Sequence, residues 1–343
     1  MNEEDIERVL QSAGPRERPP RDVEREIRGR LRTEWLAVVA GRQTSRRRQT
    51  FFALAAGVLA AVIGVWIAAP RLGGPAESVA TMTLAAGEVR IDSGWFSAWR
   101  DVAPGQALAV GQALQTGPTG RGALALPGGV SARLDHDTRL NITGSGELTL
   151  ERGALYVDAG PAATVASRLD VITPTGSVRH VGTQYEVRLI GTGVRLRVRE
   201  GRVEWHARTG GFEQSGRGEQ LMIAGDGTVE RQAIPLYGEE WDWAAATAPG
   251  IEIEGVSLSR FLTWAGRELG LEIEYATPAT AADAARIVVH GSITGLTPRQ
   301  ALDAVLPTTG VRAAIAEGRI RVGNSDPAQQ PADWFPARAP SNR

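Results

Sequence analysis

The chain of 343 residues contains neither cysteine nor lysine, so every basic side chain other than histidine is arginine. The absence of cysteine excludes a disulfide framework, a thiol nucleophile and a thiolate metal site. The absence of lysine excludes Schiff-base catalysis, Ser-Lys catalysis and the lysine of a phosphate-binding loop. Any exported part of the chain must therefore be held together by its core alone, and a hydrophobic content of 42% is sufficient for that.

Clusters of chemically reactive side chains are also scarce. The four histidines, His136, His180, His206 and His290, lie far apart and lack the spacing of metal ligands. Asp135-His136-Asp137 contains residue types that can bind a metal. The strand pattern predicts a turn at these positions, however, and we favour the turn over a metal site. No segment supplies a nucleophile together with an acid and a base. We therefore predict that the protein is not an enzyme and has no metal or cofactor site.

The charge balance is close to neutral, with a formal net charge of −1. Residues 1–50 carry a small excess of arginine over acidic residues, and the remainder of the chain carries a small excess of acidic residues. Neither part is basic enough to indicate a nucleic-acid partner.

Residues 51–69 form a long apolar run, FFALAAGVLAAVIGVWIAA, that contains no charge. As a helix this run spans roughly 28 Å, close to the roughly 30 Å of a bilayer core. It predicts a single transmembrane helix, because a buried helix of a soluble protein usually keeps one polar face. A cleaved secretory signal is the main alternative, but such a signal places its apolar core near the N-terminus rather than after a polar segment like residues 1–50.

The flanks of the run predict its orientation. Arg42 and the Arg46–Arg48 cluster precede it, whereas only Arg71 follows it closely. Basic residues beside a span stay in the cytoplasm, so the N-terminus is expected inside and the C-terminus outside.

The segment before the run, residues 1–50, contains one helical pattern. Val23, Ile27, Leu31 and Trp35 recur four residues apart and are expected to share a helix face. So short a segment cannot bury that face well by itself. The pattern fits a partner-binding surface, and it fits a helix that packs on itself or lies on the membrane equally well.

A short Gly/Pro linker, residues 70–78, leads to a region with a different pattern. Across residues 79–235, short alternations of apolar and polar residues recur between glycines, which predicts an all-β domain. The sequence GVRLRVREG is an example, because Val194, Leu196 and Val198 alternate with arginines. The pattern predicts one buried face and one charged face for that strand.

Several stretches of this β region resemble the periplasmic domain of FecR-type transmembrane regulators, the family named for ferric-citrate signalling. The most specific are the steps Gly182-Thr183 and Glu200-Gly201 before alternating strands. The stretches that carry the resemblance are LQTGP (114–118), ALALPGGV (123–130), LERGALYVD (150–158), VITPTGSVR (171–179), VGTQYEV (181–187) and VREGRV (198–203). The resemblance covers about residues 84–222. The chain departs from the family at Pro127-Gly128-Gly129, where an Asp-Gly-Ser-like turn is usual, but both sequences supply a turn.

Beyond the β region, residues 236–249 are expected to form a connector in which Trp241 and Trp243 are packing anchors. Residues 250–323 are then expected to form a small α+β module of two βαβ-like halves, before a disordered tail, residues 324–343. This module resembles the short N-terminal signalling module of secretins and TonB-dependent receptors.

Capping residues set the elements expected inside the module. The first half should contain a strand at 251–255, a helix capped by Ser257 and ended by Gly270, and a strand at 271–275. The second half should contain a strand at 286–291, a helix begun by Thr297 and Pro298, and a hairpin around Glu317-Gly318.

The fold class expected is therefore a mainly β periplasmic domain plus a small α+β module, with a single transmembrane helix and a short helical cytoplasmic segment. The FecR resemblance implies a regulator in a bacterial inner membrane that binds an extracytoplasmic-function sigma factor on the cytoplasmic side and a TonB-dependent outer-membrane transducer on the periplasmic side. A membrane-anchored envelope-binding or assembly scaffold is the alternative, since the inner segment is short and Trp35 is its only tryptophan. A membrane-anchored hydrolase is a third interpretation, and no catalytic set supports it.

Overall fold

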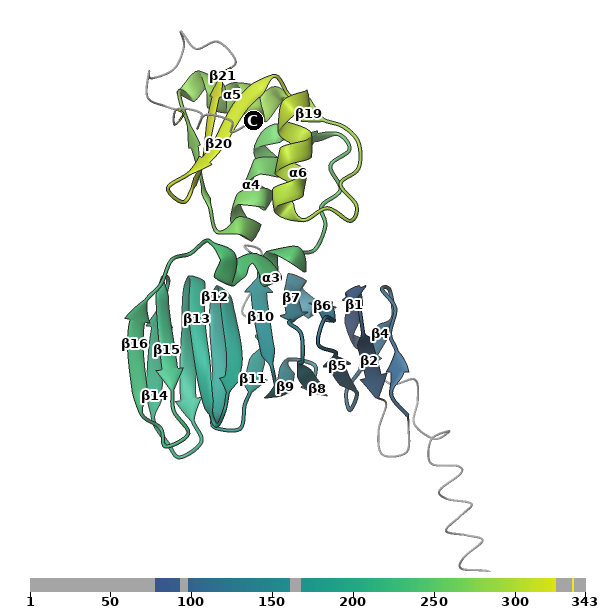
Figure 1. The fold of residues 1–343 in the computed structure, drawn as a ribbon, viewed down its shortest axis with the longest axis vertical. Helices are drawn as coiled ribbons and strands as arrows, with labels where there is room; N and C mark the ends of the chain where they lie inside the picture. Colours follow the sequence, from purple (N-terminus) through teal and green to yellow (C-terminus); the bar gives the residue numbers. More distant parts are fainter. Residues whose placement is uncertain (1–77, 93–97, 161–167, 325–334, 336–343) are drawn as a thin grey trace, which may run out of the picture. The chain divides into compact units, whose positions relative to one another are not determined.

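A computed structural model describes residues 78–92, 98–160, 168–324 and 335 (Figure 1). All of them belong to one compact unit, Ala76–Arg343. No helix among these residues is long and apolar enough to cross a bilayer. The expected span at 51–69, and the stripe Val23, Ile27, Leu31 and Trp35 before it, lie outside the described residues.

The described β region forms a 16-stranded sheet, called the β-domain below. Its strands pair in the order β3-β2-β5-β8-β9-β11-β12-β10-β7-β6-β1-β4, while β13 pairs with β12, β14 and β15, and β16 pairs with β15. The pairing of β9 with β11 is parallel, and the other pairings are antiparallel. The strands are β1 (Ser78–Ala86), β2 (Val89–Asp92), β3 (Arg100–Asp101), β4 (Ala107–Ala109), β5 (Ala113–Thr116), β6 (Arg121–Leu126), β7 (Val130–Leu134), β8 (Arg139–Gly144), β9 (Glu147–Arg152), β10 (Ala154–Ala159), β11 (Asp170–Ile172), β12 (Gly176–Ile190), β13 (Gly193–Ala207), β14 (Phe212–Gly216), β15 (Glu219–Ile223) and β16 (Val229–Ala233).

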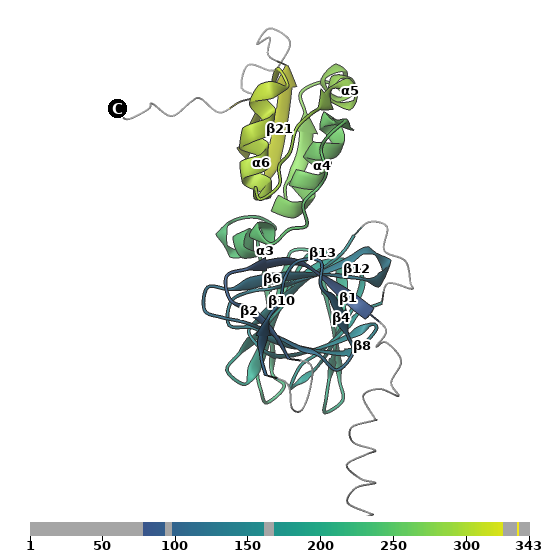
Figure 2. The ribbon, with the colours of Figure 1, turned by 90° about the vertical axis from the view of Figure 1, so that its right-hand side faces the viewer.

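The sheet curls so that one of its faces encloses the main apolar core (Figure 2). Alternation along the strands supplies this core, since every second residue of a strand points to the same face. On β13, Val194, Leu196 and Val198 are buried in it, as the alternating pattern predicted. The turns were also anticipated: the 3-10 turn η1 (Pro127–Gly129) joins β6 to β7, and Gly128 there has a φ of 73°.

The opposite face of the sheet differs from a simple solvent-facing surface. Every residue of β7 and of β10 is buried, so both faces of these two central strands are covered. On β13, Arg197 and Arg199 are 6% and 3% exposed, although the alternation indicated only a charged face. This burial arises because the chain after β16 folds back over the outer face of the sheet.

The segment that folds back contains two short helices, η3 (Glu239–Trp241) and α3 (Asp242–Ala246). Trp241 and Trp243 are buried and pack with Tyr156 of β10 in a second, smaller apolar cluster. Both tryptophans contact Tyr156 edge-on, with ring centroids 6.1 Å and 6.3 Å apart. The two residues are therefore packing anchors, as predicted. We call residues 236–249 the connector.

The C-terminal module, Val256–Asn324, contains three helices and five strands. The elements are β17 (Val256–Ser257), α4 (Leu258–Leu269), β18 (Glu272–Tyr275), α5 (Pro278–Arg286), β19 (Val288–Val289), α6 (Pro298–Val305), η4 (Leu306–Thr308), β20 (Val311–Ala316) and β21 (Arg319–Asn324). β17 pairs with β19, and a separate sheet has the order β18-β21-β20. Each half of the module thus runs from the two-stranded sheet through a helix to the three-stranded sheet.

The capping predictions for this module are confirmed. Ser257 accepts a hydrogen bond from the Arg260 amide at the start of α4, and Gly270 ends α4 in the left-handed conformation. Thr297 forms a capping box at the start of α6. The hairpin around Glu317-Gly318 is also present, as the pairing of β20 with β21 shows.

Two expected strands of the module were wrong, and one helix was not expected. Residues 251–255 form no strand, and β17 begins one residue later. The expected strand at 286–291 is reduced to β19, Val288–Val289. Helix α5 was not anticipated, although Thr277 caps it and Pro278 begins it. Strand propensity alone gave wrong assignments at the two strand positions, because the formation of a short strand depends more on its partner strand than on its own sequence.

Candidate functional site

The outer face of the β-domain carries a band of charged side chains aligned across four strands. In one row, Arg133 of β7 lies opposite Tyr156 of β10, which lies opposite Glu186 of β12, which lies opposite Arg197 of β13. In the next row, Asp158 of β10 lies opposite Gln184 of β12. Directly opposed residues on one sheet face are close enough to interact. The strand register therefore creates this cluster from segments that are distant in sequence.

Arg133 is the centre of the band and is fully buried. Its Nη1 atom donates to the carbonyl oxygen of Ala244 in the connector at 2.7 Å and lies 2.8 Å from Glu268 Oε2 on α4. Its Nη2 atom lies 3.6 Å from Asp158 Oδ2, and its guanidinium carbon is 5.0 Å from the Tyr156 ring centroid. One arginine of the sheet thus contacts the connector and the C-terminal module together.

Helix α4 contributes an arginine, Arg267, that pairs with acidic residues of the sheet. Nη2 of Arg267 donates to Asp158 Oδ1 at 2.5 Å, and Nη1 of Arg267 pairs with Glu200 of β13. Asp158 also accepts a hydrogen bond from Gln184 at 2.9 Å. The contact therefore contains two reciprocal ion pairs: an arginine of the sheet pairs with a glutamate of α4, and an arginine of α4 pairs with an aspartate of the sheet.

Arg199 completes the contact at the C-terminal end of α4. Its Nη1 atom donates to the backbone oxygen of Glu268 at 3.0 Å, and its Nε atom donates to the backbone oxygen of Leu236 at 2.7 Å. The last carbonyls of a helix carry partial negative charge, so a guanidinium is favourable at this position. The Trp241 ring covers the same guanidinium at 4.9 Å. We call Arg133, Asp158, Arg199, Arg267 and Glu268 the joint.

Burial and charge act in opposite directions on the joint. Burial alone would lower the pKa of Arg133, but the neighbouring Glu268 carboxylate, followed by Tyr156 and Asp158, outweighs burial and raises it. Arg267 behaves in the same way, with Asp158 as its main stabilising partner, so its pKa is also raised. Burial raises the pKa of Tyr156, although the two nearby arginines oppose that change. Both arginines of these pairs stay charged at any physiological pH.

A second cluster lies farther along the same face. Glu186 is fully buried and accepts hydrogen bonds from Trp243 Nε1 at 3.0 Å and from Arg195 Nη2 at 2.8 Å. Asp135 accepts hydrogen bonds from Arg188 at 2.7 Å and from Arg121 at 3.0 Å. Burial raises the pKa of Asp135, but the hydrogen bonds, led by that from Arg188, outweigh it, so the net pKa lies below its usual value. The Asp135 carboxylate is thus paired with two arginines.

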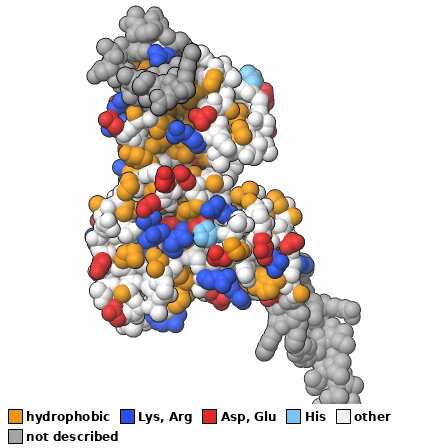
Figure 3. Space-filling model, viewed as in Figure 1, with side chains coloured by type: hydrophobic (Ala, Val, Ile, Leu, Met, Phe, Trp, Pro, Cys, Tyr) orange, Lys and Arg blue, Asp and Glu red, His pale blue; other side chains and the backbone are white. Residues whose placement is uncertain are grey.

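The sites that the sequence analysis weighed as metal ligands remain dispersed. His136 lies in the turn after β7, His180 is buried on β12, His206 is on β13, and His290 pairs with Glu254 at 2.8 Å. No group of three or more His, Asp or Glu side chains among the described residues has the arrangement of a metal site. On the face drawn in Figure 3, acidic and basic side chains are interspersed.

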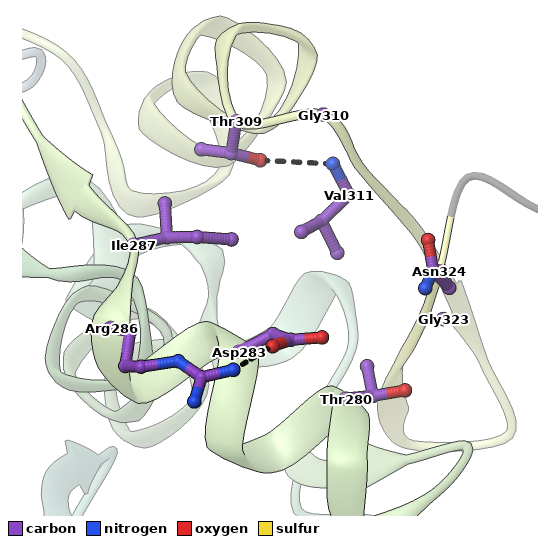
Figure 4. Close-up of a pocket in the computed structure, with 9 residues that line it drawn as sticks. All are labelled: Thr280, Asp283, Arg286, Ile287, Thr309, Gly310, Val311, Gly323 and Asn324. Atoms are coloured by element: carbon purple, nitrogen blue, oxygen red, sulfur yellow. Dashed lines mark hydrogen bonds and ion pairs between the residues drawn. The ribbon is translucent and has the colours of Figure 1, made fainter.

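The C-terminal module contains a surface cavity of about 270 Å³ between α5 and the ends of β20 and β21 (Figure 4). Its charged lining residues, Asp283 and Arg286, pair with each other at 2.5 Å. The hydroxyl of Thr309 donates to the backbone oxygen of Leu306. The two charges and this hydroxyl have partners within the protein, as does the hydroxyl of Thr280, which bonds that of Thr277. These side chains give no indication of a ligand. The joint is the stronger candidate.

No sequence motif identifies the joint, although one signal for it is present. Leu258, Phe261, Leu262 and Ala265 form the apolar stripe of α4, and Glu268 occupies its next position and is 5% exposed. A charged residue that continues an apolar stripe must find a buried partner. The sequence could not identify that partner, because Arg133 lies on a distant strand.

The fold and the joint define a class: a mainly antiparallel β-domain tied through buried charges to a small α+β module. Residues 112–204, from the turn before β5 into β13, match the model of the family described as FecR protein. This match confirms, for residues 112–204, the resemblance that the strand motifs indicated. The resemblance of the C-terminal module to a secretin or TonB-receptor module stays a prediction.

Two solved structures are similar to the chain over part of its length. Both are crystal structures of a proposed anti-sigma factor from Parabacteroides distasonis, at 17% and 16% identity. Each match covers 62% of this chain and 99% of the other, with a TM-score of 0.32. A TM-score this low supports no inference about this protein. No curated protein matches the chain.

Proposed function

We propose that the chain is a single-pass regulator of a bacterial inner membrane that controls an extracytoplasmic-function sigma factor. The observation that carries the proposal is the match of residues 112–204 to the FecR family. The order of segments supports it: an arginine-flanked apolar run at 51–69 precedes the matched residues, and a helical segment with an apolar stripe precedes the run. The stripe Val23, Ile27, Leu31 and Trp35 is the proposed sigma-factor contact.

In this proposal the β-domain and the C-terminal module are periplasmic, and a TonB-dependent outer-membrane transducer supplies the signal. A lone membrane helix has little internal bistability, so a conformational signal through it is hard to sustain. A change in the position or proteolytic lifetime of the span is the simpler route from a periplasmic event to the cytoplasmic segment.

The output surface is tested by capture of sigma factors with the full-length chain. The chain is tagged at its C-terminus and solubilised in detergent, and co-purifying sigma factors are identified by mass spectrometry. Leu31→Asp and Trp35→Asp each place a charge in the contact, where aromatic and aliphatic side chains supply most of the binding energy. Each variant is expected to abolish capture.

Arg28→Ala and Arg32→Ala are the matched controls, because these residues lie on other faces of the predicted helix. Both are expected to leave capture close to wild type. Equal capture by all four variants contradicts the sigma-factor contact. The stripe is then a membrane-surface or packing helix, and the envelope-scaffold interpretation moves ahead.

The topology is tested separately with reporter enzymes fused after residue 75. Arginines before the span and few after it should keep the N-terminus in the cytoplasm. A reporter that is active only in the periplasm is therefore expected to work at this position, and one that is active only in the cytoplasm is expected to fail. The opposite result refutes the proposed location of both folded regions.

A further inference from the structure

The joint holds two folded regions together with charges rather than with apolar side chains. The side chains of Arg133, Asp158 and Glu268 are 0%, 7% and 6% exposed, and Arg267 is 20% exposed. Removing such charges from water costs several kcal/mol per ion, and pairing recovers that cost only with good geometry. A permanent attachment of two regions would be served at least as well by apolar contacts.

The choice of charges matters most when the contact opens. An apolar interface that separates must expose hydrophobic surface to water, which is strongly unfavourable. Separated charges instead regain their hydration, so the open state of a charged interface is less unfavourable. Polar interfaces within a chain are typical of regions that move relative to each other.

The reciprocal contacts also define a single closed arrangement. Arg133 meets Glu268, Arg267 meets Asp158, and Arg199 meets the end of α4. A displacement that breaks one pair strains the others, because the three contacts lie on the last turn of the same helix. The contact is therefore expected to close or open as a unit.

The chain supplies a place for the movement. Trp241 donates to the backbone oxygen of Pro235 and Trp243 donates to Glu186, so both tryptophans are tied to the β-domain and its immediate continuation. Between α3 and β17 the residues form no helix or strand, and they include Pro249, Gly250 and Gly255. Beyond α3, the Trp264 indole of α4 donates to the backbone oxygen of Pro249, and Ile253 is buried in the core of the module, so residues 249–255 belong to the module. The bend is therefore expected between Thr247 and Pro249.

We propose that the joint is a reversible latch that fixes the C-terminal module to the β-domain through the pairs Arg133–Glu268 and Arg267–Asp158. Opening the latch swings the module away about residues 247–249 and leaves the connector helix on the sheet. The sheet face released by α4 then exposes Asp158 and the sides of Arg133 and Arg199 that had faced the helix, while the connector still contacts both arginines. The latch goes beyond the sigma-factor proposal and does not depend on it.

The test uses spin labels, for which the absence of cysteine is an advantage. Asp226→Cys in the loop before β16 and Arg286→Cys on α5 label the two regions of the full-length chain, and both positions are exposed. Glu147→Cys with Asp226→Cys is the internal pair, with both labels in the β-domain. Pulsed electron resonance then measures the distribution of distances for each pair.

The wild-type charges are expected to give one narrow distance between the two regions at low salt. Raising the salt to about 1 M should add a broad, open population, because salt stabilises the charges that opening exposes to solvent. Glu268→Gln removes the nearer of the two carboxylates beside Arg133, leaving Asp158 Oδ2 at 3.6 Å, and should shift the equilibrium toward the open state on the order of a hundredfold. Arg133→Met combined with Glu268→Leu replaces the pair with apolar side chains and should stay narrow at all salt concentrations.

Glu151→Gln is the matched control, since it removes the carboxylate of an exposed ion pair with Arg139 at 2.8 Å. It is expected to leave both distances unchanged. A wild-type distance that stays narrow at every salt concentration, or a Glu268→Gln variant that stays narrow, overturns the latch.

Arg267→Met is a milder second variant, which distinguishes opening of the latch from loss of the fold. It is expected to broaden the distance between the regions and to leave the internal pair narrow. If Glu268→Gln and Arg267→Met both broaden the internal pair as well, the charges stabilise the β-domain itself and the latch is refuted.

Discussion

A single added methyl group at Gly270 tests whether the end of α4 is seated against the β-domain. Gly270 ends the helix with a φ of 68°, a conformation that L side chains rarely adopt. A Cβ atom at this position would lie 2.1 Å from the backbone oxygen of Leu236 and 2.5 Å from Arg199 Nε. Both distances are far below van der Waals contact, and the nearer atom belongs to the backbone.

The magnitude follows from two separate penalties. Holding alanine in the left-handed conformation costs about 1 to 2 kcal/mol. Inserting a carbon into an occupied space costs about 1 to 3 kcal/mol more through displaced neighbours. Gly270→Ala is therefore expected to lower the free energy of unfolding by about 2 to 5 kcal/mol.

Gly255→Ala isolates the first penalty. Gly255 has a φ of 74°, in the same region of conformational space, but an added Cβ atom would meet nothing within 4 Å. This variant is expected to lose only about 1 to 2 kcal/mol. The assay is urea unfolding of both full-length variants, followed by tryptophan fluorescence. Equal losses in the two variants would refute the seating of α4 against Leu236 and Arg199.

Two further predictions concern the second charged cluster. Trp243→Phe keeps the aromatic ring but removes the indole N–H that donates to buried Glu186, so urea unfolding should show a loss of about 1 to 3 kcal/mol; a loss below about 0.5 kcal/mol contradicts this. Asp135→Asn should lower the melting temperature above about pH 4, because the depressed pKa of Asp135 stabilises the fold above its unfolded pKa and that contribution disappears as pH falls through the folded value. A difference between Asp135→Asn and wild type that stays constant down to about pH 2 contradicts this assignment.

Local signals in the sequence predicted the elements that depend on near neighbours. The cap residues Ser257, Thr297 and Gly270 each satisfy backbone groups within a few positions, so their roles could be predicted without the fold. The hairpin around Glu317-Gly318 between β20 and β21 is local in the same sense. The similarity of residues 112–204 to the FecR family was recognisable because the shared motifs mark turns and strand starts.

Elements that depend on distant partners were predicted less well. Residues 251–255 alternate like a strand, but they form none, and Ile251 and Ile253 instead pack against the core of the module. The arginines of β13 were expected on a charged face, and only the path of the connector explains why Arg197 and Arg199 are buried there. Strand register and chain return are non-local, so no window of sequence contains them.

The joint shows how a contact between distant segments can nevertheless be inferred from short stretches of sequence. Glu268 interrupts the apolar stripe of α4, and Arg133 stands between buried Ala132 and Leu134 on a strand whose two faces are both covered. Each charge alone would be too unfavourable to bury. Each segment therefore contains a buried charge that needs a partner of opposite sign from elsewhere in the chain. Pairing the two charges meets this need for both segments. A search for such complementary pairs between separate regions predicts where the regions meet, even when neither the register nor the connection is known.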